Sequence, residues 1–259
     1  MSAARAPNQA SDDGGWHALI ADFLAGLFLA PPSADAIASY RDGLGAMFFD
    51  ALAQEPACAA GTRQMQSAVS NDASPVAVAR TLAVAFAHLF DGVDGPRTVP
   101  LYESAYVSQS GRLFQESVGD MDALLRQLEV STSDACVEPA DHLSIELALL
   151  ARLIRGDDIA GTFGHGEAAL LDLHLLVWAP IFVERCCDAD RTGFYAGAAS
   201  VLNAFLAGRD AALQRGCLPA AVIRTIDLQA NRTGNPRTGD PRTGNPSTSN
   251  PSTSNQGVA

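Results

Sequence analysis

Lysine is absent from this 259-residue sequence, in which every basic side chain apart from histidine is an arginine. Without lysine the chain has neither a Schiff-base nucleophile nor the lysine of a phosphate-binding P-loop. Cysteine is also scarce: the five cysteines form no Cys-x-x-Cys pair. We therefore expect reduced, mostly buried thiols and no zinc site.

Long uncharged apolar runs are missing as well, since none reaches the roughly 20 residues that a membrane-spanning helix needs. The first fifteen residues lack the basic and apolar regions of a secretory signal, and they contain no Arg-Arg pair. We expect a cytoplasmic protein that does not insert into the membrane and is not itself exported by the twin-arginine route.

Acidic residues outnumber basic ones, 29 to 17, which gives a net charge of −12. Residues 231–259 hold three arginines and one aspartate, so the rest of the chain is more acidic still. Such a surface repels nucleic acid and anionic membranes and favours cationic partners.

Apolar residues recur at helical spacing along most of the chain, and no segment alternates in the manner of a β-strand. The fold class is therefore all-α, a single globular multi-helix bundle with at least seven helices. Connections are expected at 57–74 and 155–166. Helical stripes cover 16–28, 37–52, 78–89, 102–128 (with breaks near 110–111 and 118–119), 139–154, 167–187 and 192–214.

The two ends of the chain differ from this pattern. From Asn231 the sequence repeats in fives, as in Pro-Arg-Thr-Gly-Asn, and offers nothing apolar to bury, so ordering it would cost entropy without return. We predict a disordered N-terminus over 1–15, an all-helical domain over 16–228 and a disordered repeat tail over 229–259.

One short segment concentrates polar chemistry at the predicted start of a helix. Proline suits the first helical turn, and carboxylates are favoured there by the helix dipole. Two carboxylates and an imidazole within five residues exceed what a helix start needs. The segment is Glu138-Pro139-Ala140-Asp141-His142.

Several chemical interpretations of this region compete. His142 and Glu146 have the i, i+4 spacing of a metal pair, but the chain lacks the paired Glu-x-x-His motifs of helical metal bundles. The glycine-rich stretch 161–166 resembles a phosphate cradle only loosely, because it follows a helix and lacks lysine. His174 and Trp178 share a helix face, and a core histidine packed on an indole would explain them equally well.

Three clusters, in this order, resemble the redox-enzyme maturation chaperones of the TorD/DmsD type, and the resemblance runs from about residue 16 to residue 213. The clusters are Gly95-Pro96 with Tyr102-Glu103-Ser104, then Glu138-Pro139-x-Asp141-His142 with Glu146-Leu147, then His174-x-x-x-Trp178-x-Pro180.

The resemblance implies an all-helical cytoplasmic chaperone rather than an enzyme. Such proteins bind the twin-arginine leader of a molybdenum-cofactor oxidoreductase and hold the apoenzyme until its cofactor is inserted, before export. In that family the Asp and His of the acidic–proline motif are implicated in leader binding, and they correspond to Asp141 and His142.

Elementary electrostatics agrees with this role, because an arginine-bearing apolar leader needs carboxylates at one end of a groove and apolar side chains along it. The carboxylates of Glu138, Asp141 and Glu103 would receive guanidinium groups, and Trp178 would line the apolar part. With its ordinary pKa near neutrality, His142 would make binding sensitive to pH. The expected leader-binding set is Glu138, Pro139, Asp141, His142, Tyr102, Glu103 and Trp178.

Alternatives remain at this point. A helical metal- or nucleotide-dependent enzyme would use Asp141 and His142, and a plain scaffold would use the motif only as a helix cap. We expect no metal and no resident cofactor, although contact with guanine nucleotide or the molybdenum cofactor stays open. A monomer or a homodimer that exchanges helices about a hinge at 129–137 is expected.

Overall fold

The computed structural model describes residues 7–107, 116–128, 130, 137–156 and 163–216. These residues form helices and no strand, which confirms the all-α class. The tail at 229–259, the last twelve residues of the predicted domain and most of the 129–137 hinge lie outside them. The helices are α1 (Pro7–Leu29), α2 (Ala34–Arg41), α3 (Leu44–Leu52), α4 (Ala59–Val69), α5 (Pro75–Leu89), α6 (Ser104–Val107), α7 (Glu116–Gln127), α8 (Leu143–Arg155), α9 (Phe163–Leu170), α10 (Leu176–Ala189) and α11 (Phe194–Gly216), with a 3₁₀ turn η1 (Gly95–Arg97) and a π-helical turn η2 (Leu171–Leu175).

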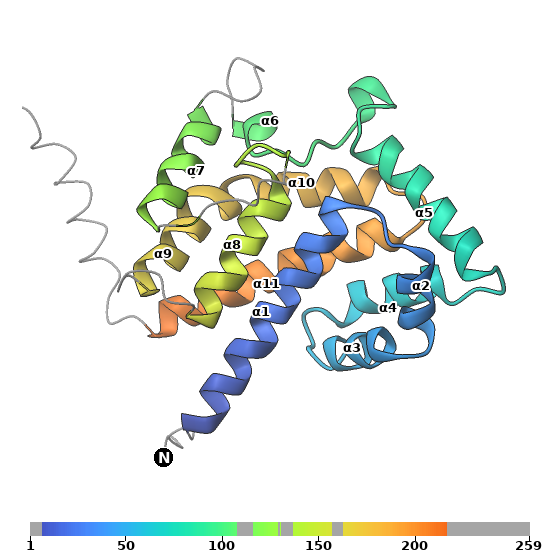
Figure 1. Cartoon of the computed structure of the whole chain (residues 1–259), viewed down its shortest axis with the longest axis horizontal. Coiled ribbons are helices and arrows are strands. Elements are labelled where there is room, and N and C mark those ends of the chain that lie inside the picture. The colour runs from blue at the N-terminus through green and yellow to red at the C-terminus, as the bar shows by residue number, and fades with distance from the viewer. Residues whose placement is uncertain (1–6, 108–115, 129, 131–136, 157–162, 217–259) are drawn as a thin grey trace, which may run out of the picture. The chain divides into compact units, whose positions relative to one another are not determined.

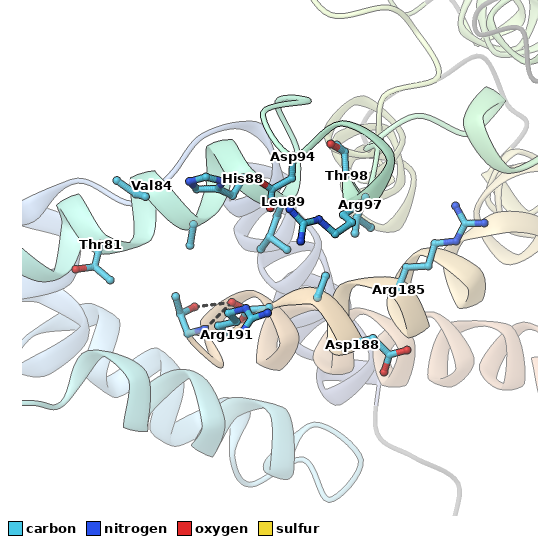
Figure 2. Close-up of a pocket in the computed structure, with 15 residues that line it drawn as sticks. Thr81, Val84, His88, Leu89, Asp94, Arg97, Thr98, Arg185, Asp188 and Arg191 are labelled. Atoms are coloured by element: carbon cyan, nitrogen blue, oxygen red, sulfur yellow. Dashed lines mark hydrogen bonds and ion pairs between the residues drawn. The ribbon is translucent and has the colours of Figure 1, made fainter.

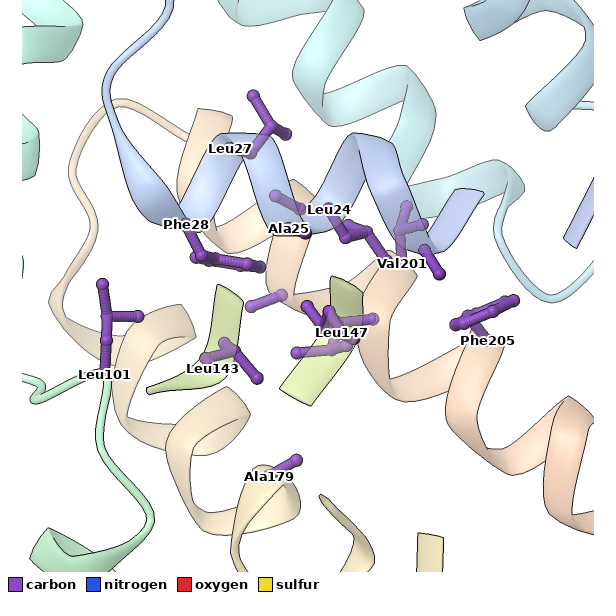
Figure 3. Packing of buried hydrophobic residues seen from close by; sticks show 14 of the residues in the cluster. Leu24, Ala25, Leu27, Phe28, Leu101, Leu143, Leu147, Ala179, Val201 and Phe205 are labelled. Carbon is purple, nitrogen blue, oxygen red and sulfur yellow. The ribbon is translucent and has the colours of Figure 1, made fainter. Parts of the chain in front are cut away.

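Helix α1 runs along α8 and also contacts α11, so that its apolar side is covered by both (Figure 1). Leu24 and Phe28 of α1 face Leu143 and Leu147 of α8 in this layer (Figure 3). All four side chains are fully buried. The first turn of α8 is therefore anchored in the core, which fixes the position of residues 138–142 directly before it.

Aromatic rings fill the centre where α1, α5, α10 and α11 meet. Phe182 of α10 lies edge-on to Phe28, with ring centroids 5.4 Å apart, and Phe90 lies edge-on to Tyr195 at 5.4 Å. The hydroxyl of Tyr195 donates to the Leu82 carbonyl at 3.0 Å, so this buried polar group is satisfied. The core thus fixes the buried side of α10.

The structure differs from the sequence-based expectation in the first half of the chain. Helix α1 begins at Pro7, although residues 1–15 were expected to be disordered. Once the apolar face has nucleated the helix, adding further residues costs little. The stripe 37–52 is split into α2 and α3, and a Cβ on Gly45 would lie 2.7 Å from the Tyr40 ring, so this turn requires glycine.

Helix α4 occupies the region 57–74, which was predicted to be a connection. Its buried face combines small residues with only two large apolar ones, Met65 and Val69, so its hydrophobic signal is weak. A Cβ on Gly61 would lie 2.5 Å from the carbonyl oxygen of Gly197, so the α4 and α11 backbones approach closely there. Close packing of the two backbones, together with the two buried apolar side chains, holds this helix.

Three boundaries in the second half also differ. Helix α7 continues through 118–119, where a break was predicted, while 110–111 lies outside the described residues. Gly156 ends α8 in a left-handed conformation, φ 71°, but α9 begins within the expected 155–166 connection. Pro139 does not start a helix, because α8 begins at Leu143.

The stretch Gly166–Ala189, which comprises most of α9 with η2 and α10, is long and apolar enough to cross a membrane by length and composition alone. Half of the residues in its most apolar window are buried inside the protein, as in the core helix of a soluble domain. The expectation concerned uncharged runs, and this stretch is interrupted by five charged residues: Glu167, Asp172, Glu184, Arg185 and Asp188.

Candidate functional site

The acidic–proline segment pairs with the chain just before α6, although the two lie far apart in sequence. The Glu103 N–H donates to the Asp141 carbonyl at 3.0 Å, and the Leu143 N–H donates to the Leu101 carbonyl at 2.8 Å. Tyr102 and His142 form the antiparallel bridge between them. Backbone bonds therefore hold the two predicted clusters against each other.

Asp141 acts as a cap for a helix other than its own. Its Oδ2 accepts the backbone N–H of Ser104 at 3.1 Å, at the start of α6, and its side chain is fully buried. A buried carboxylate that accepts a backbone N–H stabilises the local fold. The predicted contact of Asp141 with a guanidinium group has no exposed atom to support it.

His142 is the N-cap of α8. Its Nδ1 accepts the Ser144 N–H at 3.2 Å and lies 2.7 Å from the Ser144 hydroxyl. Burial lowers the pKa of His142, while the neighbouring Glu138 and Asp141 carboxylates oppose this shift. An Nδ1 that accepts hydrogen bonds requires the neutral ring, so His142 is uncharged at neutral pH and titrates below its usual range.

Glu103 is also turned inward. Its Oε2 lies 2.8 Å from Nδ1 of His174 on η2, and both side chains are nearly inaccessible to solvent. This bond ties the segment before α6 to the helical stretch that carries Trp178. The interpretation of His174 as a satisfied core histidine is the one that the geometry supports.

Trp178 is fully buried and donates its indole N–H to Oε2 of Glu146 at 3.2 Å. Burial raises the pKa of Glu146 well above its ordinary value; Glu103 raises it further, the indole bond lowers it in part, and Asp141 adds a smaller increase. Glu146 is therefore a neutral acid in the core. Its i, i+4 spacing to His142 suggested a metal pair and gave no sign of the bond to Trp178.

Tyr106 joins this interior to the surface. Its ring stacks on Trp178 with centroids 5.2 Å apart, and its hydroxyl donates to the Pro100 carbonyl at 2.8 Å. The guanidinium carbon of Arg185 lies 5.1 Å from the centre of the same ring. Tyr106 was not among the residues predicted from the sequence; it lies on α6, four residues after Tyr102, which precedes that helix.

Only part of the predicted set reaches solvent. Tyr102, Glu138 and Pro139 are half-buried, and the Tyr102 hydroxyl donates to Oε2 of Glu138 at 2.9 Å. Burial, followed by the bond to Glu138, raises the pKa of Tyr102 to about 12. We call Tyr102, Glu138 and Pro139 the acidic corner, because their accessible atoms surround one carboxylate.

The residues of this region do not fit a metal ion. Among the residues that the structure describes, no group of three or more His, Cys, Asp or Glu side chains has the arrangement of a metal site. His142 and Glu146, the suspected pair, bond to Ser144 and Trp178 instead. Ser104 Oγ, Asp141 Oδ1 and Glu146 Oε1 are buried without a hydrogen-bond partner. Such atoms are commonly satisfied by buried water.

The opposite face of the same helical stretch is apolar and exposed. Leu173, Val177 and Ile181 are 67%, 48% and 41% accessible, and they recur at i, i+4 and i+8 along η2 and α10. We call them the apolar strip. The sequence predicted only a helical stripe over 167–187 and did not indicate which of its apolar residues are exposed.

A groove of about 900 Å³ lies between α5 and the C-terminal part of α10 (Figure 2). Three arginines line it: Arg97, Arg185 and Arg191. Three aspartates line it too. Asp94 bonds to His88 at 2.8 Å, which lowers the pKa of Asp94, and Asp190 accepts backbone N–H groups at the start of α11.

Comparison with known proteins gives a consistent result. The family model described as "Nitrate reductase delta subunit" matches residues 53–184, about half of the chain. This range contains the acidic corner and the buried residues bonded beside it, which are Glu103, Asp141, His142, Glu146, His174 and Trp178. The residues that the geometry joins are therefore within the segment that defines the family.

Curated relatives carry the name "Chaperone protein TorD". The protein from Vibrio parahaemolyticus is 33% identical over 130 residues, which are 48% of this chain and 60% of that protein. The one from Aliivibrio fischeri is 32% identical over 131 residues with the same coverage. The one from Vibrio cholerae is 30% identical over 190 residues, 71% of this chain and 86% of that protein.

Proposed function

This chain belongs to the TorD-type redox enzyme maturation chaperones, and on that basis we propose that it binds a partner polypeptide without turning it over. The partner is the apo form of a molybdenum-cofactor oxidoreductase, together with its twin-arginine leader. The chaperone holds both in the cytoplasm until the cofactor is inserted and the enzyme is exported. Its relatives are named chaperones, which agrees with the expectation that the chain is not an enzyme.

The observation that carries this proposal is the acidic corner, in which a half-exposed carboxylate is held by a hydrogen bond from a neighbouring tyrosine. The Tyr102 hydroxyl fixes one oxygen of Glu138, and Pro139 restricts the backbone beside it. A guanidinium group can approach the remaining lone pairs in a partly desolvated place, where a charge-assisted bond contributes roughly 1.5–3 kcal/mol.

The buried members of the predicted set have a different role in this proposal. Asp141, His142, Glu103 and Trp178 each bond through one side-chain atom, to Ser104, Ser144, His174 and Glu146 respectively. They position the acidic corner by fixing its two chain segments, and they do not touch the leader. Loss of leader binding when they are replaced then follows from loss of the local fold.

Isothermal titration with a synthetic leader peptide tests the proposal. We expect micromolar or tighter binding that weakens when both arginines are replaced by lysine, because lysine cannot make the bidentate contact. Added salt should weaken it as well. If neither the replacement of the arginines nor added salt changed the affinity, the Glu138 carboxylate would not take part in leader binding.

A matched pair of variants separates the two roles. Glu138→Gln should weaken leader binding about tenfold, whereas Asp141→Asn should change it by less than about twofold at temperatures well below its melting transition. The reverse order would mean that Asp141 contacts the leader directly.

A further inference from the structure

The apolar strip needs an occupant that is not part of the described chain. Its three side chains are each more than two-fifths accessible, yet they lie on a helix whose other face is fully buried in the core. From Leu173 to Ile181 the strip spans about 12 Å at the usual helical rise. It offers one contiguous line of side chains, unlike a scattered surface residue that needs no explanation.

The strip is connected to the acidic corner through a single bonded pair. Glu103, next to Tyr102 in sequence, bonds to His174, next to Leu173 in sequence. On α6, Val107 adds another partly accessible apolar side chain beside Tyr106, which stacks on Trp178. Of the two ends of the strip, the Leu173 end is therefore the one that is linked through this bond to the segment that carries Tyr102.

The two ends of the strip differ in charge. At the Leu173 end are the exposed Asp172 and the acidic corner with Glu138, above the buried Glu103. At the other end Arg185 follows Ile181 by one helical turn, lies over the Tyr106 ring and lines the groove.

Beyond Ile181 acidic and basic side chains are mixed. Glu184 is exposed there, and the groove is lined by three arginines and three aspartates, of which Asp94 and Asp190 already bond to His88 and to backbone N–H groups (Figure 2). A pair of arginines is therefore attracted to the Leu173 end more strongly than to the Ile181 end.

We infer that the apolar strip binds the apolar stretch of the leader in one direction, with the arginine pair at the Leu173 end and the downstream residues leading toward the arginine-lined groove. This inference rests on the proposed function and adds the residues and the polarity of binding. The occupant has matching chemistry: two guanidinium groups, then side chains that gain free energy by leaving water.

Substitution of the strip tests the first half of this inference. The probe is a synthetic peptide with Arg-Arg followed by a run of alanine and leucine, compared with a peptide in which serine and glycine replace that run. Val177→Asp should weaken binding of the first peptide about tenfold, because it places a charge against an apolar ligand, and should leave the second unchanged.

Val76→Asp is the matched control, since Val76 is also exposed, at 67%, but lies on α5 away from the strip. It should bind both peptides like the wild type. If Val177→Asp fails to fold, Val177→Ser carries the test with an expected loss of about threefold. An unchanged affinity of a folded Val177 variant, or an equal loss in the control, would overturn the inference.

Photo-crosslinking tests the direction. A benzophenone placed beside the arginine pair should label chaperone fragments from 137–143 or 171–175, and one placed after the apolar run should label fragments from 181–191. Reversed labelling would refute the stated polarity.

The outcomes distinguish this inference from the function on which it rests. If the wild type binds neither peptide, the proposed function fails. If it binds both equally, and in an arginine-dependent way, only the role of the strip fails. A Val177→Asp variant that loses binding to anionic lipid vesicles while it keeps the leader would assign the strip to a membrane surface instead.

Discussion

Two faces of one helical stretch, η2 with α10, present opposite chemistries. His174 and Trp178 point into the protein, where Nδ1 of His174 bonds to Glu103 and the indole N–H of Trp178 donates to Glu146. Leu173 and Val177, their neighbours in sequence, point outward, and among the residues that the structure describes both remain largely exposed. Polar groups are thus buried and apolar groups exposed, the reverse of the usual distribution.

This reversal separates positioning from binding. The buried face is costly to build, because it holds Glu146 as a neutral acid beside Glu103 and Asp141, and such groups are tolerated when they specify one arrangement. The arrangement that they specify places the acidic corner at one end of the apolar strip. Asp141 and His142 of the acidic–proline segment therefore hold the proposed leader-binding surface in place and do not form part of it.

The largest effect should come from the buried face. Trp178→Ala removes a fully buried indole and leaves Glu146 without its donor, so we expect a loss of about 3–5 kcal/mol in the free energy of unfolding. Val177→Ala, one residue earlier, should change it by less than about 0.5 kcal/mol. Urea unfolding measures both, and similar losses would mean that the two faces are not distinct.

A smaller effect is expected where the two chain segments meet. Asp141→Ala leaves the Ser104 N–H buried and unpaired, which should cost about 1–3 kcal/mol. Glu138→Ala, at the half-exposed corner, should cost about 1 kcal/mol or less. Thermal melts of the two variants measure the loss of stability in each. A larger loss for Glu138→Ala than for Asp141→Ala would contradict this prediction.

Glu146→Gln should stabilise the protein at neutral and alkaline pH. The folded state keeps Glu146 protonated, while the unfolded state releases its proton above the ordinary pKa of 4.5. The free energy of unfolding of the wild type therefore falls as pH rises from 4.5 to the raised pKa of the folded state. Glutamine keeps an acceptor for the indole but has no proton to lose. Its melting temperature should exceed that of the wild type by a few degrees at pH 8 and by less near pH 5. A gap that narrows as pH rises would contradict the assignment.

The smallest effect concerns His142, whose lowered pKa acts in the opposite sense. The unfolded state binds a proton near the ordinary pKa of 6.5 before the folded state does, so this contribution is present above pH 6.5 and is lost as pH falls below it. His142→Asn keeps an N-cap and removes the titration. From pH 7 to pH 5.5 the melting temperature should fall less steeply in the variant than in the wild type. An identical slope would mean that His142 does not contribute to the pH dependence of stability.

Much of this architecture could be predicted from sequence, because helical periodicity reports which residues share a face. Periodicity does not report which helix faces pack against each other. Asp141, Glu103 and Trp178 were therefore predicted to line a binding groove, whereas the structure buries them. Proline before Asp141 suggested a helix start, whereas the actual cap is His142.

Small residues account for the missed helix α4, in which Gly61 contributes packing without hydrophobicity. The apolar strip was not predicted, because Leu173 and Val177 belong to the same apolar stripe, 167–187, as the buried residues beside them. Only the three-dimensional arrangement separates an apolar side chain that is covered from one that is not.

The most direct test of the whole account is a double-mutant cycle between Glu138→Gln and replacement of the leader's two arginines by glutamine, followed by titration calorimetry. We predict a coupling free energy of about 1 kcal/mol or more for Glu138, and none beyond error when Asp141→Asn takes its place in the cycle. Coupling at Asp141 with none at Glu138 would contradict the division between a buried scaffold and an exposed binding corner.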